Sequence, residues 1–103
     1  MCIKDRLKKG GLALINSPGR PRSREGVRLY YVNATRIALD LGLVLAGWPL
    51  VNVAMVGALS RVLGLNLESV LSSVRGMLSG RLAELNVEAA RRAYLEVMGV
   101  DGA

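Results

Sequence analysis

The spacing of hydrophobic positions changes along the chain, from short apolar runs near the start to helical spacing later. Residues 12–15 form a short apolar run that ends at the turn-forming sequence Asn-Ser-Pro-Gly, which predicts a strand buried on both faces. Residues 27–32 are rich in β-branched and aromatic side chains and predict a second strand. A proline-stiffened basic loop lies between them. We therefore expect strand, loop and strand over residues 10–36.

One helix is expected before these strands and another after them. Residues 4–9 are typical of the end of a helix, closed by two glycines and carrying cations in its last turn. Asn33 follows the second strand and can cap a helix that begins near residue 34 or 35. Ile37, Leu41, Val44 and Leu45 continue at helical spacing until the turn at residues 47–49.

The most apolar stretch, residues 47–65, predicts a helix that is buried on all sides, with Pro49 in its first turn. One face of this helix carries small residues only, so that another backbone can approach closely: Ala54, Gly57 and Ala58. Asn52 is the only polar side chain in the first two turns. Because an unpaired buried amide costs about 1–3 kcal/mol, we expect Asn52 to have defined hydrogen-bond partners.

Two further helices complete the chain. Gly64 ends the central helix, and Asn66 caps a helix whose apolar residues recur three and four apart until Gly80 stops it: Leu67, Val70, Leu71, Val74, Met77 and Leu78. Asn86 can cap a last helix that points its apolar residues inward: Val87, Ala90, Tyr94 and Met98. The prediction is an α/β fold, with two short strands followed by about four helices, in a single domain over residues 1–103 whose helical part is 37–103.

A membrane span is an alternative for the uncharged residues between Asp40 and Arg61, which are numerous enough to cross a bilayer as one helix. Gly42, Gly47 and Pro49 interrupt that helix, which favours two packed helices and no membrane. Residues 1–10 contain no apolar stretch long enough for a signal peptide, so a cytoplasmic protein is expected.

Charge is unevenly distributed. The chain has a formal net charge of +6, and residues 1–36 hold nine basic and two acidic side chains. Such a region can meet nucleic acid, phosphate or an acidic partner, or it can be a solvated loop that keeps an apolar protein in solution. Three arginines of the loop are weak phosphate-binding candidates: Arg20, Arg22 and Arg24. Tyr30 and Tyr31 are adjacent on a strand and point to opposite faces, so they cannot form one base-stacking platform.

Catalytic and metal-binding patterns are lacking in the sequence. The chain has no histidine and one cysteine, Cys2, which gives neither a disulfide framework nor a cysteine-based metal site. There is no Walker loop, zinc spacing or serine-centred triad. We predict no catalytic residue and no metal ligand in this chain.

Four segments in a fixed order resemble a known family: residues 8–18, 31–38, 49–59 and 82–94. Together they resemble the C-terminal half of the gamma subunit of 2-oxoacid:ferredoxin oxidoreductases, such as the pyruvate and 2-oxoisovalerate enzymes. The stretch Val51-Asn52-Val-Ala-Met55-Val-Gly57-Ala-Leu59 is similar to an asparagine-containing helix of that family. The resemblance implies part of a three-layer α/β/α gamma domain.

It also implies a cytoplasmic, multi-subunit enzyme that uses thiamine diphosphate, coenzyme A and iron–sulfur clusters to decarboxylate a 2-oxoacid oxidatively to an acyl-CoA and to reduce ferredoxin. The cofactor ligands would belong mainly to other subunits, and this chain alone would bind none of the cofactors and would not be catalytic. Asn52 would be a buried structural hydrogen-bonding residue rather than a ligand contact.

The chain departs from the family pattern in three places. The N-terminal half of the family domain is missing, the link between Asn16 and Val27 is short for a helix, and residues 38–47 are a few residues longer than the pattern. We therefore expect a truncated domain that forms a homo-oligomer or a complex with other oxidoreductase subunits. Two other functions remain open, a stand-alone oligomeric scaffold protein and a basic nucleic-acid-binding protein that uses the loop arginines.

Overall fold

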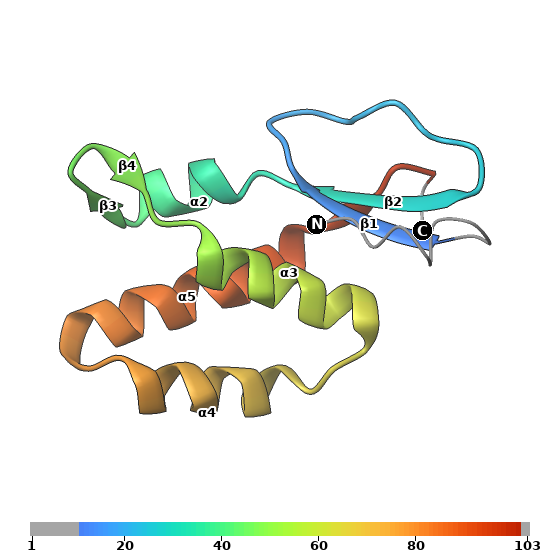
Figure 1. The fold of residues 1–103 in the computed structure, drawn as a ribbon. Helices are drawn as coiled ribbons and strands as arrows, with labels where there is room; N and C mark the ends of the chain where they lie inside the picture. The colour runs from blue at the N-terminus through green and yellow to red at the C-terminus, as the bar shows by residue number, and fades with distance from the viewer. Residues whose placement is uncertain (1–10, 102–103) are drawn as a thin grey trace.

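The computed structural model describes residues 11–101 and shows a mixed α/β fold (Figure 1). A small sheet lies beside helices α3 and α5, and α4 packs on α5, on the side away from the sheet. The elements are β1 (Gly11–Asn16), β2 (Val27–Val32), α2 (Ala34–Asp40), β3 (Val44–Leu45), β4 (Trp48–Pro49), α3 (Asn52–Leu63), α4 (Leu67–Met77), α5 (Gly80–Glu96) and β5 (Met98–Gly99). The predicted fold class is confirmed, and the helix end expected over residues 4–9 lies outside the described residues.

Both predicted strands are present, and they run parallel, from Gly11 opposite Val27 to Asn16 opposite Val32. Residues 17–26, which join them, contain no helix, as the short link predicted. A third strand, β5, pairs antiparallel with β2, and this strand was not predicted. Met98 was expected to point inward from the last helix, but α5 ends at Glu96 and Met98 is an exposed residue of β5.

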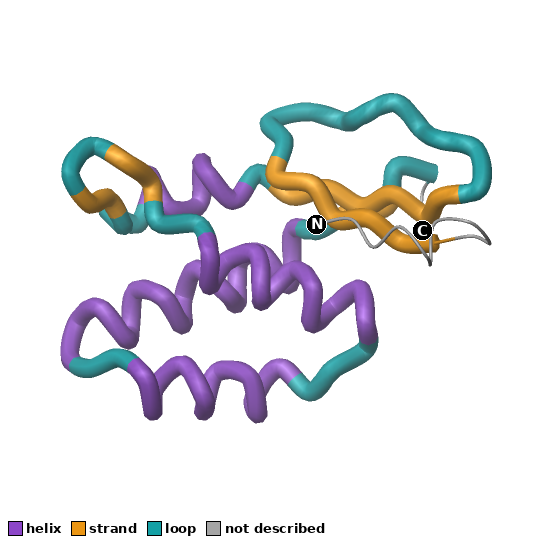
Figure 2. Tube along the Cα trace, viewed as in Figure 1, coloured by secondary structure: helices purple, strands orange, loops and turns teal. Residues whose placement is uncertain are grey.

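The segment between α2 and α3 differs most from the prediction. Asn33 caps α2 as expected, accepting a hydrogen bond from the Arg36 N–H at 3.0 Å. The helix, however, ends at Asp40, and a hairpin of β3 and β4 follows (Figure 2). Its turn residues Ala46 and Gly47 have φ of 52° and 83°, the signs that a two-residue hairpin turn of type I′ requires. The predicted helix through Leu45 is therefore wrong.

The predicted start of the central helix is also wrong. Pro49 belongs to strand β4, and α3 begins three residues later, at Asn52. The prediction for its small-residue face is confirmed, because a Cβ built on Gly57 would lie 2.6 Å from the Cα of Ala90 on α5. Burial on all sides is not confirmed. Val56, Leu63 and Asn52 are exposed, since the described helices cover only one side of α3.

Helices α4 and α5 form an antiparallel pair. The start of α4 was predicted correctly. Gly64, with φ of 70°, ends α3, and the Asn66 side chain caps α4 by accepting from the Ser69 N–H at 3.1 Å. Met77, expected to be inward, is exposed at the end of α4. The last helix begins at Gly80 and not at residue 87, so Asn86 is no cap. It is buried in mid-helix, where its Nδ2 donates to the Leu82 carbonyl at 2.9 Å.

The core is divided by the sheet. On one face, Leu14 and Val32 join small residues of the helices in the main cluster: Ala34, Ile37, Ala38, Leu43, Ala54, Ala58, Ala89 and Ala93. On the other face, Ala13, Leu29 and Val100 form a smaller cluster. Tyr30 packs against the first cluster and Tyr31 against the second, which confirms that the two rings lie on opposite faces. None of the helices over residues 11–101 is long and apolar enough to cross a membrane.

Candidate functional site

The basic loop, residues 17–26, leaves β1 and arches over the sheet before it enters β2 (Figure 1). Its first residue is fixed by a hydrogen bond from the Ser17 N–H to the Val32 carbonyl at 3.0 Å, and its end by one from the Val27 N–H to the Arg24 carbonyl at 3.2 Å. Arg20, Arg22 and Arg24 are exposed. Over residues 11–101, no carboxylate forms an ion pair with any of the three.

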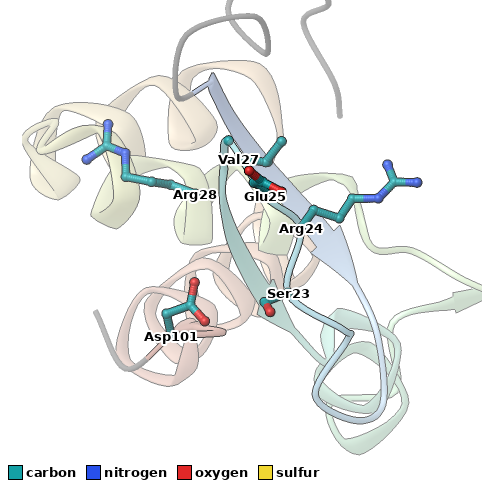
Figure 3. Close-up of a pocket in the computed structure, with 7 residues that line it drawn as sticks. Ser23, Arg24, Glu25, Val27, Arg28 and Asp101 are labelled. Atoms are coloured by element: carbon teal, nitrogen blue, oxygen red, sulfur yellow. The ribbon is translucent and has the colours of Figure 1, made fainter.

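A hollow of about 520 Å³ lies where this loop joins β2, and Figure 3 shows its lining residues: Ser23, Arg24, Glu25, Gly26, Val27, Arg28 and Asp101. Arg24 and Arg28 project in opposite directions from the chain, and the Glu25 carboxylate lies between their bases. The two guanidinium groups therefore do not converge on one anion. Of the three predicted arginines, only Arg24 lines the hollow.

Arg28 and Asp101 also line this hollow, and neither was predicted to be a site residue. Arg28 is the one charged residue in an otherwise uncharged strand, and this was the available signal. Asp101 gave no signal, because it reaches the hollow only through the β2–β5 pairing, which was not predicted. With two arginines and two acids along its edge, the hollow has mixed charge.

A second hollow, of about 360 Å³, lies at the carboxyl ends of β1 and β2, where parallel sheets commonly bind ligands. Its polar groups serve the fold instead. The Asn16 Oδ1 accepts hydrogen bonds from the backbone N–H groups of Ala34 and Thr35, at 2.9 and 3.3 Å, and the Asn16 Nδ2 donates to the Thr35 Oγ1 at 3.0 Å. Arg36 and Asp40 form an exposed ion pair. Asn16 thus anchors α2 to β1, a role that its sequence position did not indicate.

Asn52 does not lie where the sequence predicted. Its side chain is exposed at the first turn of α3, and it makes no hydrogen bond to another side chain or backbone group over residues 11–101. The predicted burial is wrong because the chain turns through the hairpin before the helix begins, so the first turn of α3 stays at the surface. Its role as structural residue or ligand contact stays a prediction.

Several of the remaining charged side chains form surface pairs. Arg75 with Glu84 and Arg91 with Glu68 connect α4 to α5, at 3.7 and 3.4 Å. Such exposed pairs each contribute less than about 1 kcal/mol. In the part of the chain that the structure describes, no group of three or more His, Cys, Asp or Glu side chains could hold a metal ion.

Comparison with known proteins gives consistent matches over nearly the whole chain. A family model described as pyruvate ferredoxin/flavodoxin oxidoreductase matches residues 2–96. The pyruvate synthase subunit PorC of Methanocaldococcus jannaschii is 38% identical over 97 residues, which is 93% of this chain and 52% of that protein. The common gamma subunit of the pyruvate/ketoisovalerate oxidoreductases of Thermococcus kodakarensis is 36% identical over 98 residues, 85% of this chain and 49% of that protein.

The structural comparison agrees. The crystal structure of the pyruvate oxidoreductase subunit PorC from Thermotoga maritima superposes with a TM-score of 0.71 at 28% identity, covering 88% of this chain and 53% of that chain. The chain therefore spans about half the length of the relatives it matches.

Proposed function

The chain belongs to the pyruvate ferredoxin/flavodoxin oxidoreductase family, and from this premise we propose that it is a non-catalytic, gamma-type component of a 2-oxoacid:ferredoxin oxidoreductase. The family resemblance inferred from the four ordered segments is confirmed. One observation carries the proposal, namely that the family match extends over residues 2–96. The whole complex would decarboxylate a 2-oxoacid oxidatively to an acyl-CoA.

Two features of the described residues support the absence of a cofactor site in this chain. Residues 11–101 contain neither cysteine nor histidine, the ligands that iron–sulfur clusters take. The guanidinium groups of Arg24 and Arg28 point apart and so do not clamp the diphosphate of a thiamine cofactor. We therefore assign thiamine diphosphate, coenzyme A and the clusters to other subunits and route no chemical step through this chain.

The role that we assign is assembly. The chain would pack against other oxidoreductase subunits in the cytoplasm. Two features support a docking role: apolar side chains are exposed at the hairpin and along α3, and the loop arginines carry positive charge without carboxylate partners over residues 11–101.

For Arg20, Arg22 and Arg24 we propose a contact with an acidic or phosphate-bearing group of a partner. Their exposure leaves the guanidinium groups available for charge-assisted hydrogen bonds. Replacing all three by alanine should weaken assembly and reduce its salt dependence. If the triple variant assembles as well as the natural chain, with the same dependence on salt, the three arginines do not make this contact.

The test is reconstitution with the alpha, beta and delta subunits from the same source, followed by size-exclusion chromatography. Co-elution in a fixed ratio is expected. A chain that forms a stable homo-oligomer and does not bind the other subunits would support the alternative of a stand-alone scaffold protein. Salt-dependent binding of DNA or RNA, lost in the triple arginine variant, would point to the nucleic-acid alternative.

A further inference from the structure

The loop between β1 and β2 carries its cations on an extended segment. The chain bends at residues 18–19 and turns at residues 25–26, and residues 20–24 run between them without a bend (Figure 1). Pro21 has a fixed φ and favours an extended residue before it. Alternate side chains of an extended chain point to one side, about 6.6 Å apart. We call the cations at alternate positions of this segment the arginine row: Arg20, Arg22 and Arg24.

Hydrogen bonds hold both ends of the segment. At its start, the Ser17 N–H donates to the Val32 carbonyl at 3.0 Å, and the Ser17 hydroxyl donates to the Gly19 carbonyl at 2.7 Å. At its end, the Val27 N–H donates to the Arg24 carbonyl at 3.2 Å and closes the turn into β2. A segment that is ordered before it binds loses less conformational entropy on binding. The arginine row is therefore prepared for a ligand.

The charge of the arginine row is not neutralised by the described residues. All three arginines are exposed, and over residues 11–101 none of them forms an ion pair with a carboxylate. Four other arginines each have a carboxylate within 4.0 Å: Arg36, Arg75, Arg91 and Arg92. The row thus differs from the rest of the charged surface, and its potential favours an anionic ligand.

A single phosphate fits the arginine row poorly. Phosphate sites bring several donors onto one anion. The arginines of the row are spaced by about 6.6 Å along an extended chain, and Arg24 and Arg28 project in opposite directions (Figure 3). Two carboxylates also line the hollow at the end of the row, Glu25 and Asp101. They would repel a phosphate dianion.

Single-stranded nucleic acid also fits the row poorly, because such sites combine a cationic groove with aromatic side chains on which bases stack. The aromatic residues of the chain are three tyrosines and one tryptophan. Tyr30 and Tyr31 are half-buried against the two faces of the sheet, and the Arg61 guanidinium lies over the Tyr94 ring at 5.1 Å from its centre. Trp48 is exposed on the hairpin, toward the opposite end of the molecule from the loop (Figures 1 and 2).

We propose that the arginine row binds an extended acidic segment of a partner protein, in which carboxylates at alternate positions pair one to one with Arg20, Arg22 and Arg24. An extended acidic segment repeats its side chains at the same interval of about 6.6 Å. Each guanidinium group can then donate charge-assisted hydrogen bonds to one carboxylate. The inference rests on the proposed function for the identity of the partner, an oxidoreductase subunit, and it specifies the chemistry and spacing of the contact.

The test titrates the full chain with two synthetic peptides of one composition and follows the arginine Nε–Hε signals by NMR. The first peptide is Glu-Ser-Glu-Ser-Glu, and the second is Ser-Glu-Glu-Glu-Ser, both with blocked ends. The alternating peptide is expected to shift the three signals of the row. Because each exposed ion pair contributes up to about 1 kcal/mol, it should bind about two- to fivefold more tightly than the contiguous peptide.

Three variants separate the spacing of the row from its charge. Arg22→Gln removes the middle cation and should raise the dissociation constant of the alternating peptide about two- to fivefold. Arg81→Gln is the matched control, because Arg81 is exposed at the start of α5 and has no ion pair over residues 11–101. It should leave the dissociation constant nearly unchanged. Pro21→Gly keeps the charge, loosens the segment and should weaken binding about two- to fivefold. The amide spectra of the variants verify that they fold.

Three results would overturn the proposal. The first is the absence of any shift in the row with the alternating peptide. The second is equal affinity for the two peptides, or equal effects of Arg22→Gln and Arg81→Gln, which would reduce the row to nonspecific attraction. The third is a shift of the same signals by inorganic phosphate or by a single-stranded oligonucleotide at lower concentration than the peptide requires.

These results are distinguishable from a failure of the proposed function, because the reconstitution with other subunits uses no peptide. A chain that co-elutes with the alpha, beta and delta subunits but does not bind the alternating peptide retains the proposed function and excludes this contact. A chain that binds the alternating peptide but does not co-elute retains the arginine row as an acidic-segment site and excludes the oxidoreductase subunits as its partner.

Discussion

Gly57 of α3 lies directly against the backbone of Ala90 on α5, so close that a Cβ on Gly57 would be 2.6 Å from the Ala90 Cα and 2.7 Å from its carbonyl carbon. Neither atom is at the end of a flexible side chain, and the two helices would have to separate to admit a methyl group. This contact sets the distance between α3 and α5, on which the main cluster depends.

We predict that Gly57→Ala lowers the free energy of unfolding by up to about 2 kcal/mol, because an overpacking cost of about 1–3 kcal/mol is offset by a gain of about 1 kcal/mol in helix propensity. Gly76→Ala is the matched control, because Gly76 is in α4 with no other atom near its missing Cβ. It should gain up to about 1 kcal/mol. Urea denaturation measures both, and equal effects of the two substitutions would refute the close helix contact.

Asn16 provides a second test, on the connection between β1 and α2. Asn16→Ala removes the acceptor for two backbone N–H groups of α2 and should cost about 1–2 kcal/mol of unfolding free energy. Thr35→Val removes only the contact with the Asn16 Nδ2 and should cost less. Urea denaturation, with amide hydrogen exchange of α2, measures the effect. Unchanged protection of the Ala34 and Thr35 amides in Asn16→Ala would contradict the anchoring role.

The hairpin turn makes opposite predictions for two neighbouring residues. Ala46→Gly relieves the strain of a positive φ and should raise the free energy of unfolding by up to about 1 kcal/mol. Gly47→Ala introduces the same strain and should lower it by about 1 kcal/mol. Thermal unfolding followed by circular dichroism gives the sign of each change. If Gly47→Ala stabilises the chain, the type I′ turn is not the conformation in solution.

The features that could be predicted from the sequence depend on local signals. An apolar run that ends at turn residues located β1, and a run of β-branched and aromatic residues located β2. Asn33, Gly64 and Asn66 marked helix ends through their own side-chain or backbone chemistry. The close packing at Gly57 followed from the spacing of small residues on one helical face.

The errors arose where distant contacts decide the conformation. Val44 and Leu45 have helical spacing relative to Ile37, but positive φ at Gly42, Ala46 and Gly47 turns the chain into a hairpin. Strand β5 has two residues, too few for any periodic pattern, and it is defined by its pairing with β2. Asn86 resembled a cap because of its residue type, but the helix begins nearly two turns earlier, at Gly80.

Local backbone conformation and distant contacts also decide the geometry of the candidate site. The basic loop was located from composition alone, yet the direction of each arginine depends on the local backbone, which places Arg24 and Arg28 on opposite sides of the hollow. Asn52 was expected to be buried because its neighbours are apolar. Burial depends on what covers a helix, and over residues 11–101 no helix covers that side of α3.

The central claim is that the chain acts as a gamma-type component of a 2-oxoacid:ferredoxin oxidoreductase. The most direct measurement is native purification of the tagged chain from its source cells, with partners identified by mass spectrometry. We expect the alpha, beta and delta subunits of one oxidoreductase to co-purify in a constant ratio. Recovery of the chain alone, or with partners that share no subunit of such a complex, would contradict the account.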